Sequence, residues 1–304
     1  MRSVIASSVK RRLYDVDFYH RRLRRDRFPG VAVLAYHGVR PDEPAPERQP
    51  FAALHVHAKE LDSHCRLLRE TCHPISLAEW RSTLRGEAIL PERPVLVTFD
   101  DGYCSVWKHA LPILLRHSIP AVVFVCSGPV EGRRLFWFDA VAREKGEEEV
   151  ERMKASPLDQ WQSSSRADSH ANEDDLAAPL SVEELKKLAA QPGIEIGSHT
   201  VSHPILANAP YETQRREIVD DKARLETWIG KPVSSFAYPN GRPGQDYTAS
   251  TVGLVGESGF DVAFTTRPGF ACADESPLEC SRFLMLTGIS REELAHRLSF
   301  SWRR

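Results

Sequence analysis

Pro94-Val95-Leu96-Val97-Thr98-Phe99 is followed directly by Asp100-Asp101-Gly102. The apolar and β-branched run at 94–97 predicts a buried parallel strand, and the glycine marks the loop after it. Catalytic groups of α/β proteins lie at the carboxyl ends of such strands. Two adjacent buried carboxylates repel each other unless a cation neutralises one of them. The stretch therefore predicts a metal site in which one carboxylate is a ligand and the other a free base. A solvated Asp-Asp-Gly turn is the simpler alternative.

A second stretch supplies nitrogen ligands. Ile194-Glu195-Ile196 reads as another short strand, and Gly197-Ser198-His199-Thr200-Val201-Ser202-His203 follows it. A lone histidine is usually a structural residue, but two histidines four residues apart at a strand end favour a metal site. Asp101, His199 and His203 together offer one oxygen and two nitrogens. That is the ligand set of a catalytic zinc site that keeps one position open for water.

Four motifs carry a resemblance to a known family. Thr98–Gly102 and His199–His203 resemble the first two motifs of the polysaccharide deacetylases, carbohydrate esterase family 4. Phe236-Ala237-Tyr238-Pro239-Asn240-Gly241 resembles the third motif, in the form found in a branch that acts on exopolysaccharide glucosamine. Gly259–Phe264 resembles the strand that carries the fourth. The similarity spans Val31 to Arg282 and implies a distorted (β/α) barrel of about seven strands.

The rest of the chain alternates strand and helix patterns, which by itself predicts an α/β domain. We expect one domain at residues 29–290, with an insertion at about 135–180 that is partly helical and partly flexible. Residues 291–304 are expected to form a helical tail. Strands are expected at 31–36, 94–97, 121–126, 194–196, 233–237 and 261–265, and helices at 55–70, 106–117, 181–190, 210–229 and 246–258.

The composition restricts the compartment and the partners. The 304 residues carry a net charge of −2, so no polyanionic or polycationic partner is indicated. Six cysteines without Cys-x-x-Cys spacing favour reduced thiols. No apolar stretch is long enough to be a transmembrane helix or a signal peptide. We therefore expect a cytoplasmic protein, with the inner membrane surface as its alternative location; the sequence does not predict an oligomeric state.

Residues 1–28 form a basic extension. Nine Lys and Arg residues against three Asp residues give this segment a net charge of +6, and apolar residues are interleaved with them. A basic amphipathic helix of this kind can lie on an anionic membrane surface. The alternative is a solvated helix that packs on the outside of the barrel. Nucleic-acid binding is not expected, because no other part of the chain is basic.

The resemblance implies hydrolysis of an N-acetyl amide on an amino sugar. In that reaction Asp101, His199 and His203 hold a divalent metal, with Zn²⁺ as the default and Co²⁺, Ni²⁺ or Fe²⁺ as alternatives. Asp100 is the base that activates water, and a backbone N–H after Asp101 helps to stabilise the oxyanion. His37, at the end of the first strand, is the candidate acid for the leaving amine. His296 is the second candidate.

The chain departs from the family in its third motif. Many relatives have an Arg before the Pro that fixes the base, but Ala237 and Tyr238 stand in that region. Arg282 or Arg242 is therefore expected to hold Asp100 instead. Asp261 either orients a site histidine, as in relatives, or lies at the surface.

Other functions remain open. The same site could hydrolyse a non-sugar amide, or a small or lipid-linked sugar in place of a polymer. The chain could also be a carbohydrate-binding relative without turnover, although it keeps the base and all three ligands. A dinucleotide-binding fold is disfavoured, because no Gly-x-Gly-x-x-Gly follows a strand.

Overall fold

A parallel sheet forms the centre of the molecule. The structure is a computed structural model that describes residues 2–42, 50–157, 171–172, 175–272 and 274–300. Within these residues seven strands form a continuous path, and β4 (His73–Pro74) pairs beside it with β5. The path runs in the order β10 (Phe283–Leu284), β1 (Ala32–Tyr36), β5 (Pro94–Phe99), β6 (Ala121–Val125), β7 (Ile194–Ser198), β8 (Ser235–Ala237) and β9 (Val262–Phe264).

The two ends of this path meet. Thr265 N–H donates to the carbonyl of Cys280 at 2.9 Å, and Cys280 N–H donates to the carbonyl of Ala263 at 2.8 Å. Cys280 begins the segment that leads into β10, so these bonds link β9 to the other edge of the sheet. The expected distorted (β/α) barrel of about seven strands is confirmed.

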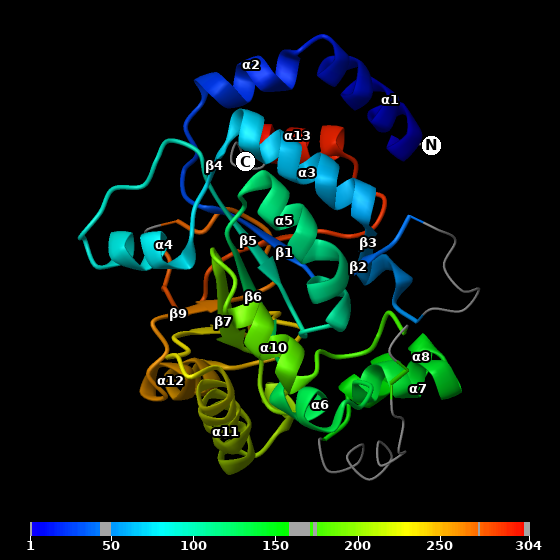
Figure 1. Ribbon diagram of the computed structural model, residues 1–304, viewed down its shortest axis with the longest axis vertical. Coiled ribbons are helices and arrows are strands. Elements are labelled where there is room, and N and C mark those ends of the chain that lie inside the picture. Colours follow the sequence, from blue (N-terminus) through cyan, green and yellow to red (C-terminus); the bar gives the residue numbers. More distant parts are fainter. Residues whose placement is uncertain (1, 43–49, 158–170, 173–174, 273, 301–304) are drawn as a thin grey trace.

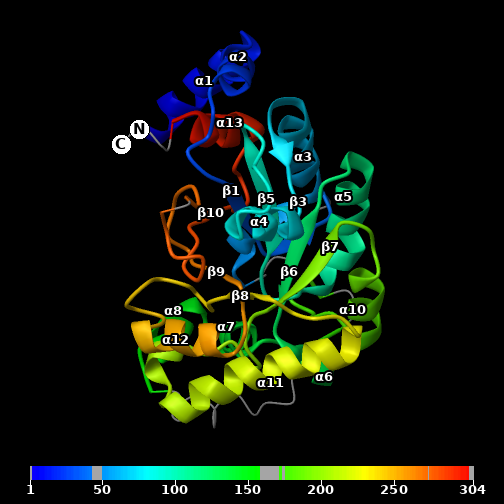
Figure 2. The same ribbon diagram turned by 90° about the vertical axis from the view of Figure 1, so that its left-hand side faces the viewer.

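Helices cover the outside of the sheet (Figures 1 and 2). Their bounds are α1 (Arg2–Asp15), α2 (Phe18–Arg25), α3 (Ala58–Thr71), α4 (Leu77–Leu84), α5 (Leu111–His117), α6 (Ser127–Gly132), α7 (Trp137–Lys145), α8 (Glu147–Lys154), α10 (Val182–Ala189), α11 (Tyr211–Ile229), α12 (Ala249–Glu257) and α13 (Arg291–Phe300). Short elements are η1 (Ala52–Leu54), η2 (Val106–Ala110), η3 (Leu206–Asn208), and the parallel pair β2 (Gly38–Arg40) and β3 (His55–His57).

Strand alternation divides the core into two layers. Leu96 and Phe124 belong to an inner cluster that also includes Trp80 of α4. Val97 and Val123 belong to the larger cluster between the sheet and the outer helices. Period-two alternation places Asp100, four residues after Leu96, on the inner side at the end of β5.

Local signals set several helix ends as expected. Ser181 caps α10 in a capping box with Glu184, and Gly230 ends α11 with a φ of 66°. Pro112 occupies the first turn of α5, after the π-helical turn η2. The helix expected from His55 is wrong at its start. Residues 55–57 form β3 instead, because they pair with β2.

The two ends of the chain pack together on the outside of the barrel (Figures 1 and 2). Tyr19 and Leu23 of α2 are buried, and the Tyr19 hydroxyl lies 3.0 Å from His296 Nδ1 of α13. The insertion contains α7 and α8, and residues 158–170 and 173–174 of its expected flexible part lie outside the described residues. All six cysteines are free. No helix in the described ranges is both long and apolar enough to cross a membrane.

Candidate metal centre and catalytic cleft

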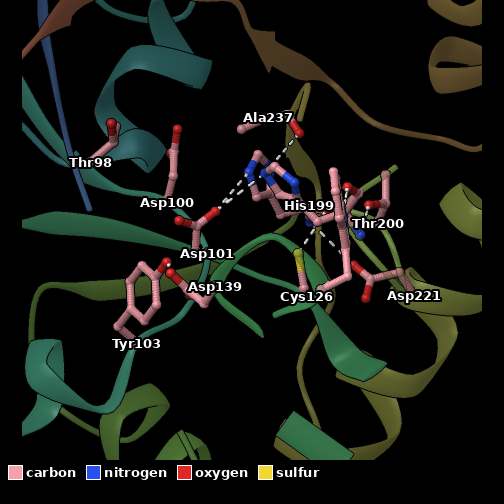
Figure 3. A network of polar contacts seen from close by, with 12 residues as sticks. Thr98, Asp100, Asp101, Tyr103, Cys126, Asp139, His199, Thr200, Asp221 and Ala237 are labelled. Carbon is pink, nitrogen blue, oxygen red and sulfur yellow. Dashed lines mark hydrogen bonds and ion pairs between the residues drawn. The ribbon is translucent and has the colours of Figure 1, made fainter. Parts of the chain in front are cut away.

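The fold brings the three expected ligands together. Asp101 follows β5, and His199 and His203 follow β7. The Nε2 atoms of both histidines lie 3.4 Å from the same Asp101 oxygen, Oδ1, and one potential ligand atom from each residue lies within 4.8 Å of the others. All three residues are buried. Figure 3 shows the Asp101 carboxylate directed at the imidazole of His199.

The backbone at these residues is strained. Asp101 has a φ of 72°, Thr200 of 71° and His203 of 58°, all in the left-handed region. For a residue with a Cβ this conformation costs about 1–2 kcal/mol. The hydroxyl of Thr200 accepts a hydrogen bond from His203 N–H at 3.1 Å, which helps to hold the loop. Strain of this kind concentrates at functional sites.

The donor set fits a divalent metal. Asp101 Oδ1 is buried and accepts no hydrogen bond. His199 Nδ1 donates to the Ala237 carbonyl at 2.6 Å, which leaves Nε2 free as a ligand atom. Burial lowers the pKa of His203 to about 3, so this ring is neutral. Burial would lower the pKa of His199, but Asp101 and Asp100 raise it, so its Nε2 gives up its proton when metal binds. One carboxylate oxygen and two imidazole nitrogens are a typical zinc ligand set.

Electrostatics favour an ionised Asp101. Burial by itself would raise the pKa of Asp101, but the contact with His199 and the charge of His37 hold it well below its ordinary value. The carboxylate is therefore in the form that binds metal.

Two carboxylates of α11 hold the loop that carries the histidines. Asp221 accepts hydrogen bonds from Ser198 Oγ at 2.6 Å, Ser127 N–H at 2.8 Å and His199 N–H at 3.2 Å. One turn earlier, Glu217 accepts from the N–H and the hydroxyl of Ser202, both at 2.8 Å. Burial raises the pKa of Asp221 to about 7 and also raises that of Glu217. The sequence alone indicates neither carboxylate, because acidic residues in a charged helix are usually solvated.

Asp100 lies next to the ligand cluster and is paired with Arg282. The guanidinium donates to both carboxylate oxygens, at 2.7 and 2.8 Å, and its Nε donates to the Thr265 carbonyl at 2.8 Å. Only 1% of Arg282 is exposed. Burial would raise the pKa of Asp100, but the Arg282 charge holds it below its usual range. The other expected partner, Arg242, pairs with Asp246 instead.

A cleft of about 610 Å³ opens above these residues. His37 lines it together with Asp100 and the three ligand residues. His296 does not, because it faces Tyr19 and lines a separate cavity, so its expected role as the acid is wrong. The remaining lining residues are Phe51, Ala52, Ala53, Leu54, Phe138, Glu147, Glu151, Lys154, Tyr238, Asn240, Thr266, Leu284 and Leu286.

Asp261 is half exposed and pairs with Arg81, so it orients no site histidine. Two amides after Asp101 are already engaged, because Gly102 N–H donates to the Asp100 carbonyl and Cys104 N–H to that of Ala178. These two amides are therefore unavailable to an oxyanion.

The aromatic run at 136–138 packs mainly in the core. Phe136 is fully buried, and Trp137 Nε1 donates to the His203 carbonyl at 3.0 Å. Phe138 packs against the His203 ring with 5.0 Å between centroids and lines the cleft. The insertion thus supports the metal loop from one side.

Comparisons with known proteins identify the family of the chain. The family model "Polysaccharide deacetylase" matches residues 88–263, more than half of the chain. YxkH of Bacillus subtilis (strain 168) is 23% identical over 261 residues, which cover 86% of this chain and 73% of YxkH. The poly-beta-1,6-N-acetyl-D-glucosamine N-deacetylase of Escherichia coli (strain K12) is 37% identical over 94 residues, 31% of this chain and only 13% of that protein.

A solved structure shows the same fold. The Streptococcus pyogenes deacetylase PplD, in complex with acetate, superposes with a TM-score of 0.67 at 23% identity, over 89% of this chain and 99% of that one. With the family model matched over most of the barrel, the chain belongs to the polysaccharide deacetylase family.

Proposed function

We propose that the protein is a metal-dependent hydrolase that removes the N-acetyl group from an amino sugar and releases acetate. One observation carries this proposal. A buried cluster of Asp101, His199 and His203 shares the floor of one cleft with an ionised Asp100. A binding module would have no need of a separate base beside a complete ligand set.

Each residue of the site has a separate role in the proposed reaction. Asp101, His199 and His203 would hold the metal, which when bound supplies Lewis acidity toward a water molecule and the amide carbonyl. Asp100 accepts the proton of the attacking water, while Arg282 keeps its carboxylate ionised and fixed in orientation. His37 donates a proton to the leaving amine, because expulsion of an amide anion is prohibitive at neutral pH. Zn²⁺ fits the donor set best, and Co²⁺, Ni²⁺ or Fe²⁺ would bind as well.

N-Acetylglucosamine chains are the first substrate to test. The printed name of the Escherichia coli relative supports this choice, although the chain spans only a small part of that protein. The cleft is large enough for more than the acetamido group alone. Glu147, Glu151 and Lys154 of α8 contribute polar groups to its lining.

The test is acetate release from N-acetylglucosamine oligomers by metal-loaded protein, with free amine counted in parallel. The matched variant is Asp100→Asn, which keeps the shape of the side chain and removes the base. We expect equal release of acetate and amine from the wild type, and a rate lowered by about 10²–10⁴-fold in the variant at unchanged metal content. Wild-type turnover that persists in Asp100→Asn would refute the role of Asp100. Metal-loaded protein that releases no acetate from any N-acetylated sugar would refute the function.

A further inference from the structure

One side of the cleft is formed by aliphatic side chains. Ala52, Ala53 and Leu54 come from η1, and Leu284 and Leu286 come from β10 and the residues after it. We call these five residues the aliphatic wall. Ala53 is exposed and the three leucines are half-buried, so the wall meets solvent in the cleft.

The backbone holds the two halves of the wall together. Thr287 N–H donates to the Ala53 carbonyl at 2.9 Å, which ties the segment after β10 to η1. Met285 N–H donates to the carbonyl of Ala35 in β1 at 2.9 Å. Ala35 lies two residues before His37, so the wall stands beside the candidate acid. The wall is therefore a fixed part of the site.

The wall is a poor surface for a chain of sugars. Each hydroxyl pressed against it would lose its water partners without gaining a protein partner. Sugar rings bind aromatic faces, and the wall itself has none. Phe51, the residue before Ala52, contacts Phe138 with 5.9 Å between ring centroids and has Lys154 Nζ 5.8 Å from its own centroid. Partly exposed apolar side chains rimmed by polar groups are typical of a site for an apolar ligand.

We propose that the aliphatic wall binds an apolar aglycone, so that the preferred substrate is an N-acetylated amino sugar attached to a lipid-like alkyl chain. This inference rests on the proposed function for its orientation. His37 would protonate the leaving amine, so the sugar lies on the His37 side of the cleft. A group attached to that sugar then lies along the wall, while the acetyl group points to Asp101 and Asp100.

The experiment compares two glycosides that share one sugar. The methyl and octyl β-glycosides of N-acetylglucosamine, the latter below its micelle concentration, are titrated into metal-loaded Asp100→Asn protein by calorimetry. We expect the octyl glycoside to bind at least about tenfold more tightly, because several of its methylene groups move from water into contact with the wall. Equal affinities for the two glycosides would overturn the inference.

Wall variants identify the surface responsible. In the same background, Leu54→Asn and Leu286→Asn should each reduce the octyl preference several-fold. The control is Leu115→Asn on α5, which replaces a leucine that is 41% exposed and lies outside the cleft. This variant should keep the full preference for the octyl glycoside. A preference that survives both wall variants would place the alkyl chain elsewhere and overturn the inference. Wild-type acetate release from the same glycosides is measured separately. Octyl binding without acetate release would reject the hydrolase and leave the apolar site standing.

Discussion

Asp100 and Asp101 are neighbours in sequence with opposite surroundings. Strand alternation carries Asp100 to the inner side of the barrel, where Arg282 meets both of its oxygens. The left-handed backbone at Asp101 directs the carboxylate of this residue toward His199 and His203. One carboxylate is thereby balanced by a cation of the protein, and the other is free to bind a metal. Their separate roles follow from this single turn of the chain.

The Asp100–Arg282 pair leads to a stability prediction. Arg282→Met leaves a buried carboxylate without its partner, and we expect the free energy of unfolding to fall by about 3–5 kcal/mol. Arg282→Met combined with Asp100→Asn should recover part of that loss, because the buried charge is gone. Urea unfolding of the metal-free proteins measures both values. If the double variant is no more stable than Arg282→Met, Arg282 does not stabilise the protein by neutralising the Asp100 carboxylate.

At this scale the sequence predicts much of the site. Asp100, Asp101, His199 and His203 can be predicted because short strand-end motifs carry them. Arg282 could be named only as one of two candidates, since its contact with Asp100 joins residues 182 positions apart. Asp221 could not be predicted, because only the packing of α11 shows that it is buried.

Among the elements, α11 has the clearest link to function. Its carboxylates at Glu217 and Asp221 lie one turn apart and hold the loop at Ser198 and Ser202. Hydrogen-bond partners around a metal site orient its ligands, and their loss weakens metal binding. The helix therefore acts as a support for the metal loop as well as a cover for the sheet.

We expect Asp221→Asn to weaken metal binding by about 10–100-fold. Replacing the carboxylate with an amide disturbs acceptors that serve Ser198, Ser127 and the backbone of His199. The measurement is a Co²⁺ titration followed by visible absorption, with thermal unfolding of the metal-free protein in parallel. Asp220→Asn is the matched control, because Asp220 is the exposed neighbour on the same helix. Equal Co²⁺ affinities in the two variants would contradict this account of α11.

Helix α3 is tied to the C-terminal segment by a buried imidazole. His64 Nε2 donates to the Ile289 carbonyl at 2.8 Å, and the Tyr36 hydroxyl lies 3.0 Å from Nδ1. Burial lowers the pKa of His64 to about 4, against about 6.5 in the unfolded chain. The unfolded chain therefore binds an extra proton between these pH values, and stability from this group falls as pH drops through 6.5 toward 4.

The corresponding prediction concerns acid stability. Between pH 7 and pH 4 the metal-free wild type should lose about 3 kcal/mol more unfolding free energy than His64→Gln, whose side chain does not titrate. The control is His73→Gln, at an exposed histidine, which should follow the wild type. Parallel stability curves for the wild type and His64→Gln would refute a neutral buried His64.

On the scale of the whole molecule, the barrel could be predicted from the sequence. The packing of the segments on its outer surface could be predicted only in outline. Alternating strand and helix patterns, with the family motifs, lead to the α/β barrel. The join through Cys280 and the packing of α1 and α2 on α13 depend on contacts between distant segments. β3 shows the same limit, because its pairing with β2 overrides a local helical pattern.

The N-terminal surface carries a prediction about location. Val9 is 52% exposed, Val16 60% and Phe18 38%, and Arg21 and Arg25 beside them are largely exposed. We propose that this surface rests on anionic membranes, and expect the protein to sediment with vesicles that contain phosphatidylserine at low salt and to be released at high salt. Replacing Phe18, Arg21 and Arg25 with Ser, Glu and Glu should abolish sedimentation. If the protein sediments equally with neutral vesicles and with those that contain phosphatidylserine, the surface does not recognise anionic lipid. Helices α1 and α2 would then serve only to cover the barrel.

The central claim is that Asp101, His199 and His203 hold one catalytic metal ion. The most direct measurement is a titration of metal-free protein with Zn²⁺, in which bound metal and acetate release from N-acetylglucosamine oligomers are followed together. We predict that activity rises in proportion to bound metal and levels off at one equivalent. Asp101→Asn should neither bind tightly nor release acetate. Full activity in metal-free protein, or tight one-to-one binding that survives in Asp101→Asn, would contradict the account.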